Sequence, residues 1–249
     1  MLINAVASLD GKATVGDKAG AIGSPTDLVL MRALRARADA VMIGAGTLRA
    51  EKLTLAVPEE LARAREARAL KPQPLAVVAT VSADIPLQTN LLGPAPDDLL
   101  LLVSPETPEE RLAALPSHAS VEVVPKVTAP SPEGFASSAP DSAPRLDLTK
   151  ALETLKKRYA TGVLLVEGGP SLNQSLVRGG LADELFLTLA PKLLGGVRPE
   201  ALTMLEGPAV PPQKTKPKLI SVHLSDDELF LRYALRPARS HPPFRSDSR

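Results

Sequence analysis

The sequence has no cysteine and no tryptophan, and its 249 residues include only four phenylalanines, two tyrosines and three histidines. Without cysteine, the chain has no disulfide, no thiolate zinc site and no thiol nucleophile. The histidines, His118, His223 and His241, lie far apart with no metal-binding spacing, so we expect no bound metal. So few aromatic side chains also argue against a base-stacking surface for single-stranded nucleic acid.

Charge and hydrophobicity exclude two further classes of partner. The formal net charge is +1, which gives no basic surface of the kind that binds nucleic acid. No apolar run is long enough to cross a bilayer, and the N-terminus lacks the basic region of a secretory signal. We therefore expect a cytoplasmic protein without nucleic-acid or membrane partners. Its 44% hydrophobic residues can fill a sizeable core.

Apolar strand-like segments alternate with helical ones, which predicts one α/β domain over residues 1–236, with a mostly parallel twisted sheet and flanking helices. The turn signal Ser225-Asp226-Asp227 predicts a C-terminal antiparallel hairpin. The expected strands are 2–7, 40–43, 75–81, 99–104, 120–124, 163–166, 184–190, 218–224 and 228–235, and the expected helices are 25–37, 58–70, 107–115, 149–159 and 171–178. Ser24-Pro25-Thr26-Asp27 predicts the start of the first of these helices, with Ser24 as the N-cap and Asp27 as an acid in the first turn. We expect a long surface loop at 126–146 and a disordered tail at 237–249.

The segment from Val163 to Asn173 is the most informative part of the chain, because it predicts a buried strand, a glycine turn and a helix start. Gly168 and Gly169 let the backbone approach a ligand closely, and Ser171 is the expected helix N-cap. Free N–H groups at such a helix start suit a phosphate. An ordinary turn would explain the glycines alone. Glu167, at the carboxyl end of the strand, favours a ligand site.

Three other segments carry candidate ligand-binding groups. A second buried strand runs into Gly44, Gly46 and Thr47, a turn that lacks the third glycine of a dinucleotide fingerprint but can bind one phosphate with Thr47 as helix cap. Lys12 follows an Asp-Gly turn and is either a solvated charge or a donor to a substrate carbonyl or phosphate. Arg35, near the end of the first expected helix, either complements the helix dipole or reaches an anionic substrate.

Five sequence blocks occur in a fixed order along residues 3–196. They are Ala-Ser-Leu-Asp-Gly-Lys, Leu-Arg-Ala with Gly-Ala-Gly-Thr, Leu-Val-Glu-Gly-Gly-Pro-Ser-Leu, Gly-Leu-Ala-Asp-Glu-Leu, and Leu-Ala-Pro-Lys-Leu-Leu-Gly-Gly. In this order the chain resembles the reductase domain of bacterial riboflavin biosynthesis, the C-terminal half of the bifunctional deaminase–reductase. The resemblance implies a dihydrofolate-reductase-like fold, NADPH as the hydride donor, a small-molecule substrate and a homodimer.

The reaction implied by the resemblance reduces the ribose of 5-amino-6-(5-phosphoribosylamino)uracil to a ribityl chain, by hydride transfer to C1′ of an open-chain imine. Lys12, Arg35 and Glu167 are implied to bind the substrate, with Lys12 and Glu167 assisting catalysis. The residues implied to bind NADPH are Val6, Gly44, Gly46, Thr47, Glu51, Gly168, Gly169, Pro170, Ser171, Leu172 and Asn173.

The chain departs from the family pattern in two respects. It lacks the H-x-E and P-C-x-x-C zinc motif of the deaminase half, so we expect a stand-alone reductase. Ala56 stands where the family has an arginine that helps to hold the substrate phosphate, and the arginines of the 58–70 helix are an alternative source of charge. Glu51 stands in for a family aspartate. Two alternatives therefore stay open: a same-fold NADPH reductase of dihydrofolate, another pterin or an unphosphorylated pyrimidine, and a non-catalytic NADP-binding dimer.

Overall fold

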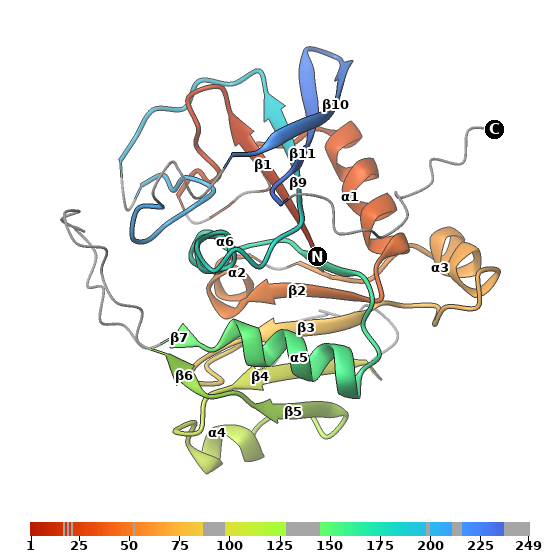
Figure 1. The fold of residues 1–249 in the computed structure, drawn as a ribbon, viewed down its shortest axis with the longest axis vertical. Coiled ribbons are helices and arrows are strands. Elements are labelled where there is room, and N and C mark those ends of the chain that lie inside the picture. Colours follow the sequence, from red (N-terminus) through yellow and green to blue (C-terminus); the bar gives the residue numbers. More distant parts are fainter. Residues whose placement is uncertain are drawn as a thin grey trace.

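The computed structural model describes residues 1–16, 18, 20, 22–51, 53–86, 98–127, 145–197, 200–210 and 216–236. The strands of the main sheet are β1 (Leu2–Ser8), β2 (Ala40–Gly44), β3 (Leu75–Ala79), β4 (Leu99–Val103), β5 (Ala119–Val123), β8 (Leu164–Val166), β9 (Glu184–Ala190), β10 (Lys218–Ser225) and β11 (Glu228–Ala234). They form one nine-stranded sheet in the order β10-β11-β9-β1-β8-β2-β3-β4-β5 (Figure 1). Every pairing from β9 to β5 is parallel, and β11 and β10 add an antiparallel hairpin. The predicted fold class is confirmed.

Helices cover both faces of the sheet, because its central strands are apolar on both faces. In β2, Val41 and Ile43 point into one core and Ala40 and Met42 into the other, as the two-residue period of a strand requires. Leu34 and Leu48 belong to the first core and Leu155 and Leu176 to the second, so α1 and α2 cover one face and α5 and α6 the other. The helices are α1 (Pro25–Arg37), α2 (Ala45–Ala50), α3 (Glu59–Glu66), α4 (Glu109–Ala113), α5 (Leu148–Arg158) and α6 (Pro170–Arg178).

Several predicted boundaries are wrong. The 58–70 helix ends at Glu66, after which Ala69 turns with a positive φ of 58°. The glycine turn after β2 is in fact the start of α2, so Thr47 lies inside that helix and Gly44 is its N-cap. Gly169 takes the N-cap position of α6, and Ser171 is therefore not the cap.

The ends of the expected 126–146 loop are ordered. Two short strands, β6 (Lys126–Val127) and β7 (Arg145–Leu146), pair antiparallel and bring these ends together. The rest of that expected loop, residues 128–144, lies outside the described residues, as does the expected tail at 237–249.

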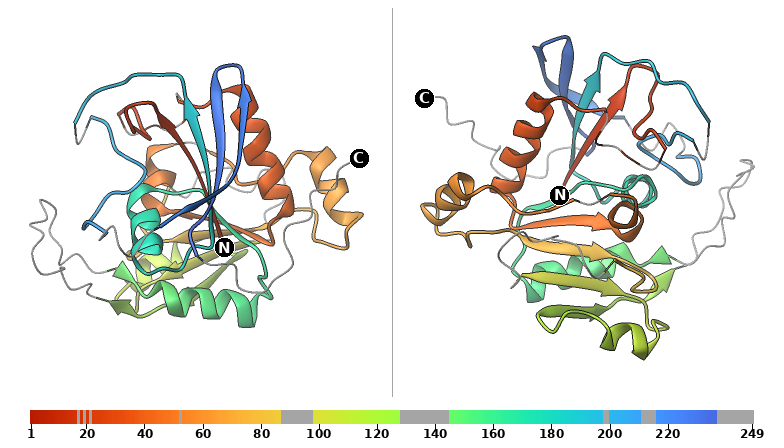
Figure 2. Two further views of the ribbon diagram at one scale, coloured as in Figure 1. Left: turned by 45° about the horizontal axis from the view of Figure 1, so that its top comes forward. Right: turned by 180° about the vertical axis from the view of Figure 1, so that it is seen from behind.

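The C-terminal hairpin forms at the predicted turn. Asp226 and Asp227 both have positive φ, 48° and 67°, between the paired residues Ser225 and Glu228. Positive φ at both central residues is typical of the type I′ turn that connects two antiparallel strands tightly. Figure 2 shows the hairpin of β10 and β11 beside β9, in the part of the sheet that is strongly twisted relative to β3–β5.

Helix α1 is fixed at both of its ends. At the N-terminus, the predicted cap Ser24 accepts hydrogen bonds from the N–H groups of Thr26 and Asp27, at 3.1 and 3.2 Å. At the C-terminus, the guanidinium of Arg65, 2% exposed, donates to the carbonyls of Arg35, Ala36 and Ala38. Cationic donors at the last carbonyls of a helix satisfy orphan acceptors and complement the dipole.

Within the described ranges, no helix is both long enough and apolar enough to span a membrane.

Candidate functional site

A cavity of about 1070 Å³ opens where the carboxyl ends of β1, β2 and β8 meet α1. Its walls also include the segments 53–58 and 202–206. All of the residues expected to bind a cofactor line it, as do Arg35 and Glu167. The cavity lining includes Asn4, Val6, Asp27, Leu28, Met31, Arg32, Arg35, Gly44, Gly46, Thr47, Glu51, Ala56, Glu167, Gly168, Gly169, Pro170, Ser171, Leu172, Asn173 and Glu206.

The two glycine turns predicted from the sequence contact each other at the floor of this cavity. The N–H of Gly44 donates to the carbonyl of Gly168 at 2.8 Å. Gly168 has a φ of +92°, which L side chains rarely adopt, and its peptide bond to Gly169 is cis. A Cβ on Gly169 would lie 2.6 Å from Oγ1 of Thr47. A side chain at position 169 would therefore force the hydroxyl of Thr47 to move, because the two turns approach so closely.

The chemistry of this floor fits a ligand with phosphate and amide groups. No side chain caps the N-terminus of α6, so its first N–H groups can bind an anion. The side-chain oxygens of Asn4 and Asn173 are buried and accept no hydrogen bond from the described residues. Buried acceptors are normally satisfied, so these two beside one cavity are places where a ligand or a bound water can supply the missing donors. A nicotinamide dinucleotide carries such groups.

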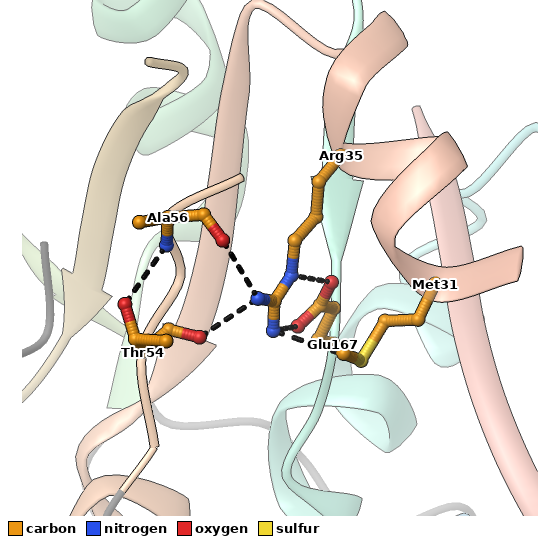
Figure 3. Close-up of polar contacts among 5 residues, drawn as sticks. All are labelled: Met31, Arg35, Thr54, Ala56 and Glu167. Carbon is orange, nitrogen blue, oxygen red and sulfur yellow. Dashed lines mark hydrogen bonds and ion pairs between the residues drawn. The ribbon is translucent and has the colours of Figure 1, made fainter. Parts of the chain in front are cut away.

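Arg35 and Glu167 form a bidentate ion pair across the cavity (Figure 3). Nε and one terminal nitrogen of Arg35 donate to the two carboxylate oxygens of Glu167, each at 2.7 Å. The other terminal nitrogen donates to the carbonyls of Thr54 and Ala56, at 2.7 and 3.3 Å. The two side chains of the pair are only 5% and 9% exposed.

This pair changes the interpretation of both residues. The guanidinium of Arg35 points to Glu167 rather than along the axis of α1, so complementing the helix dipole is not its main interaction. Its donors are occupied by protein oxygens, and this leaves Arg35 as a group that positions Glu167 and the segment around Ala56. Removing one partner of such a buried pair typically destabilises a protein by about 3–5 kcal/mol, because an uncompensated charge remains.

Asp27 is a cavity-lining acid that the sequence interpretation missed, since it treated this residue only as part of a helix start. Its carboxylate accepts a hydrogen bond from the hydroxyl of Thr188 at 2.6 Å. Burial raises the pKa of Asp27 above its ordinary value of 3.8, and the Thr188 hydrogen bond partly opposes this. The nearby carboxylates of Glu228 and Glu167 raise the pKa of Asp27 further. A carboxyl group with a raised pKa in a cavity can hold a proton for transfer.

A second buried acid supports the same end of α1. Glu228, 3% exposed, accepts a hydrogen bond from the hydroxyl of Ser24, the N-cap of the helix. Asn4 was also missed by the sequence interpretation. The alternation of β1 could have identified it, because Asn4 and Val6 share one strand face and both line the cavity.

Lys12 is the one expected substrate residue that does not line the cavity, although the following residues Ala13 and Thr14 do. Its N–H donates to Oγ of Ser8 at 2.9 Å, and it forms an isolated bridge with Thr203. The preceding Asp10 accepts hydrogen bonds from the hydroxyl of Ser8 and the N–H groups of residues 194 and 195, which lower the pKa of Asp10 to about 2. The predicted turn is therefore a structural junction, with Lys12 beside the cavity.

Comparison with known proteins gives consistent results. The RibD C-terminal domain family model matches residues 1–229. The 2,5-diamino-6-ribosylamino-4(3H)-pyrimidinone 5′-phosphate reductase of Archaeoglobus fulgidus is 32% identical over 198 residues, 79% of this chain and 82% of that protein. The protein of the same name from Methanothermobacter thermautotrophicus is 30% identical over 213 residues, 84% of this chain and 85% of that protein.

A solved structure shows the same fold. The pyrimidine reductase-like protein of Corynebacterium diphtheriae matches with a TM-score of 0.75 at 24% identity, over 95% of this chain and 92% of that one. The reductase fold expected from the sequence resemblance is therefore confirmed.

The raised pKa of Asp27 predicts a specific pH dependence of stability. The folded protein holds the Asp27 proton more tightly than the unfolded chain does. Protonation of Asp27 therefore stabilises the folded protein in full below pH 3.8, and this stabilisation is lost as the pH rises through the pKa of Asp27 in the folded protein. The substitution Asp27→Asn removes this loss of stability with rising pH, because asparagine does not titrate. The unfolding free energy of the variant minus that of the parent should therefore rise between pH 4 and 7, by about 1.4 kcal/mol for each tenfold difference in proton affinity between the folded and unfolded chains.

Denaturant unfolding of both proteins across that pH range measures this difference. Asp226→Asn, in the exposed hairpin turn, reports the general effect of removing one carboxylate. A difference for Asp27→Asn that stays flat or falls with pH would show that burial does not favour the protonated acid.

Proposed function

Because the chain belongs to the RibD C-terminal domain family, we propose that it is an NADPH-dependent reductase that converts the ribosyl group of a 5′-phosphorylated ribosylaminopyrimidine to a ribityl group. The observation that carries this proposal is one cavity in which two contacting glycine turns face a paired Glu167 and a protonatable Asp27. The backbone of the turns suits a dinucleotide, and the acids suit a substrate with amino groups and a sugar.

On this proposal, the floor of the cavity binds the cofactor. The uncapped start of α6 and the turn at Gly44–Thr47 hold its phosphates through backbone N–H groups. Asn4 and Asn173, whose side-chain oxygens lack donors among the described residues, bind its amide or hydroxyl groups. When bound, NADPH supplies the hydride that adds to C1′ of the open sugar.

The wall formed by α1 and Glu167 binds the substrate. Glu167 accepts hydrogen bonds from amino groups of the pyrimidine, and Arg35 holds its carboxylate in place. Asp27 delivers the proton that O4′ takes up as the C1′–O4′ bond opens, while the glycosidic nitrogen keeps its proton as an iminium, so that hydride addition to C1′ yields the neutral secondary amine. Lys12 keeps its expected role as a donor from the rim, which requires its side chain to reach inward from the junction beside Ala13.

Two pyrimidines are candidate substrates. The sequence resemblance implies 5-amino-6-(5-phosphoribosylamino)uracil. The stand-alone relatives are named for the 2,5-diamino-4(3H)-pyrimidinone, which has an amino group in place of one carbonyl oxygen of the uracil. Both carry the phosphoribosylamino group that is reduced. A partly buried Asp27 with a raised pKa at the cavity wall favours a catalytic protein over a purely non-catalytic NADP-binding module, since partial burial of an acid is unfavourable.

We also propose that the protein is a cytoplasmic homodimer that associates through an apolar sheet face. Three rows of side chains cross β10, β11 and β9 in register on the face opposite Thr188. The rows are Leu219, Tyr233 and Leu185, then Val222, Leu231 and Leu187, then Leu224, Leu229 and Leu189.

In β10, Leu219 is 49% exposed, Val222 is 51% exposed and Leu224 is 71% exposed. Exposed apolar surface of this extent is typical of an interface, and a second copy can cover it by two-fold symmetry.

The direct test of the activity is NADPH oxidation at 340 nm with each of the two pyrimidine phosphates. We expect turnover with at least one of them and slower turnover with NADH. Dihydrofolate is measured in parallel, because turnover of dihydrofolate alone would assign the chain to a different substrate class. NADPH binding without any turnover would favour the non-catalytic module.

The role of Glu167 predicts a split between two measurements. Glu167→Gln removes the charge that binds Arg35 and the pyrimidine, so kcat/KM for the pyrimidine should fall about 100-fold, equivalent to about 2.7 kcal/mol. The Kd for NADPH, measured by fluorescence, should change by less than about threefold, since the glycine turns remain. Glu60→Gln, on the exposed side of α3, is the matched control. Equal losses in kcat/KM and NADPH affinity would rule out a substrate role.

Association through the apolar face predicts a change of mass. Sedimentation equilibrium should give twice the 26.2 kDa of one chain for the parent protein. Val222→Lys with Leu224→Lys should give the single-chain mass, because two charges would be buried unpaired in the interface. Val123→Lys, at the opposite edge strand β5, should leave the mass unchanged. A parent protein of single-chain mass would contradict the proposal.

A further inference from the structure

Among the described residues, the cavity is lined by more acidic than basic side chains, although the relatives are named for a substrate with a 5′-phosphate. Such a phosphate carries close to two negative charges and needs cationic partners. The charged residues of the lining are Asp27, Glu51, Glu167 and Glu206, and Arg32 and Arg35. In the function proposed above, backbone N–H groups at the start of α6 hold the cofactor phosphates, so a separate substrate phosphate beside the acids of the wall would be repelled unless one of these arginines binds it.

Arg35 has no donor left for a phosphate of this kind. Its nitrogens donate to both oxygens of Glu167 and to the carbonyls of Thr54 and Ala56. One of them also lies 3.6 Å from the sulfur of Met31. Reassigning Arg35 to an anion would leave the carboxylate of Glu167 buried without its partner, which is unfavourable.

Arg32 is in the opposite situation. It lies three residues before Arg35 on α1, and a spacing of three places both side chains on neighbouring positions of one helix face. Arg32 lines the cavity and is exposed. Within the part of the chain that the structure describes, its guanidinium makes no hydrogen bond and no ion pair.

We propose that Arg32 binds the 5′-phosphate of the substrate at the rim of the cavity. This inference rests on the function proposed above. A planar guanidinium binds two phosphate oxygens at once, with charge-assisted hydrogen bonds. The rim also suits the phosphate, because a strongly hydrated dianion keeps part of its water there while the pyrimidine enters the drier interior.

The other described cations near this end of α1 lie outside the cavity lining. The sequence interpretation considered the arginines of α3 as a source of charge, but Arg65 is buried against the carbonyls at the end of α1. Arg63 pairs with Glu59 on the exposed side of its own helix. Neither lines the cavity, and Lys12 is also outside the lining. Among the described residues, Arg32 is therefore the cavity-lining cation whose donors are available.

The test compares substrates with and without the phosphate. For the parent enzyme, kcat/KM is measured with the pyrimidine 5′-phosphate and with its dephosphorylated form. Arg32→Gln should lower kcat/KM for the phosphorylated substrate about 10- to 100-fold, the range expected for charge-assisted hydrogen bonds. Arg32→Gln should leave kcat/KM for the dephosphorylated substrate and the Kd for NADPH unchanged. Arg32→Lys, which keeps the charge, should recover part of the loss.

As a control, Arg63→Gln removes one arginine charge from an exposed site outside the cavity. It should leave kcat/KM unchanged for both substrates. If Arg32→Gln lowers kcat/KM equally for both substrates, Arg32 has a structural role and the proposal is overturned. An unchanged preference of the variant for the phosphorylated substrate would also overturn the proposal. The melting temperature of each variant shows whether it is folded.

A binding measurement separates this proposal from the proposed function. Titration calorimetry with ribitol 5-phosphate and with ribitol needs no turnover. The parent should bind the phosphate ester about 10-fold or more tightly than ribitol, and Arg32→Gln should lose that preference. If the enzyme reduces neither pyrimidine but this preference depends on Arg32, the function fails and the phosphate site stands. If the parent shows no preference, the phosphate site is wrong.

Discussion

The cavity depends on the ion pair between Arg35 and Glu167, which joins α1 to the end of the central strand β8. The pair is buried, bidentate and supplemented by the two carbonyls of the 54–56 segment, so three separate parts of the chain meet at one guanidinium. Because both charges would be unfavourable alone, their positions are strongly coupled. Arg65 extends this arrangement by fixing the carbonyls at the end of α1, including that of Arg35. The orientation of α1 relative to the sheet is thereby set by cationic side chains as well as by apolar packing.

The floor and the wall of the cavity are built from different groups. The floor is made mainly of backbone, where Gly44 and Gly168 contact each other and glycine at 169 leaves room for Thr47. The wall along α1 is made of side chains, with Asp27 near its N-terminal end and Arg35 near its C-terminal end. Eight residues separate these two, which is about 12 Å along a helix. The backbone floor depends on its glycines, whereas the side-chain wall can vary with the substrate.

The sequence predicted the parts of this structure that depend on local patterns. Continuous apolar runs such as β4 identified buried parallel strands, and Ser24-Pro25 identified the start of α1. The glycine turns identified the cavity floor. Helix α2 was missed because Gly46 and Thr47 disfavour helix, and its formation depends on the buried Leu48. The Arg35–Glu167 pair was also beyond local patterns, since 132 residues separate its partners and each alone resembles a substrate ligand.

The pairing of β6 with β7 affects how the chain can vary in length. Their ladder joins Lys126 to Leu146 and Val127 to Arg145, and none of these four residues lines the cavity. Any peptide inserted between these two paired ends starts and finishes at neighbouring positions. For a flexible insertion, each doubling of its length costs only about 0.6 kcal/mol of loop-closure entropy. This junction is thus a place where the protein can accept an inserted peptide or a fused domain while the geometry around α1 is preserved.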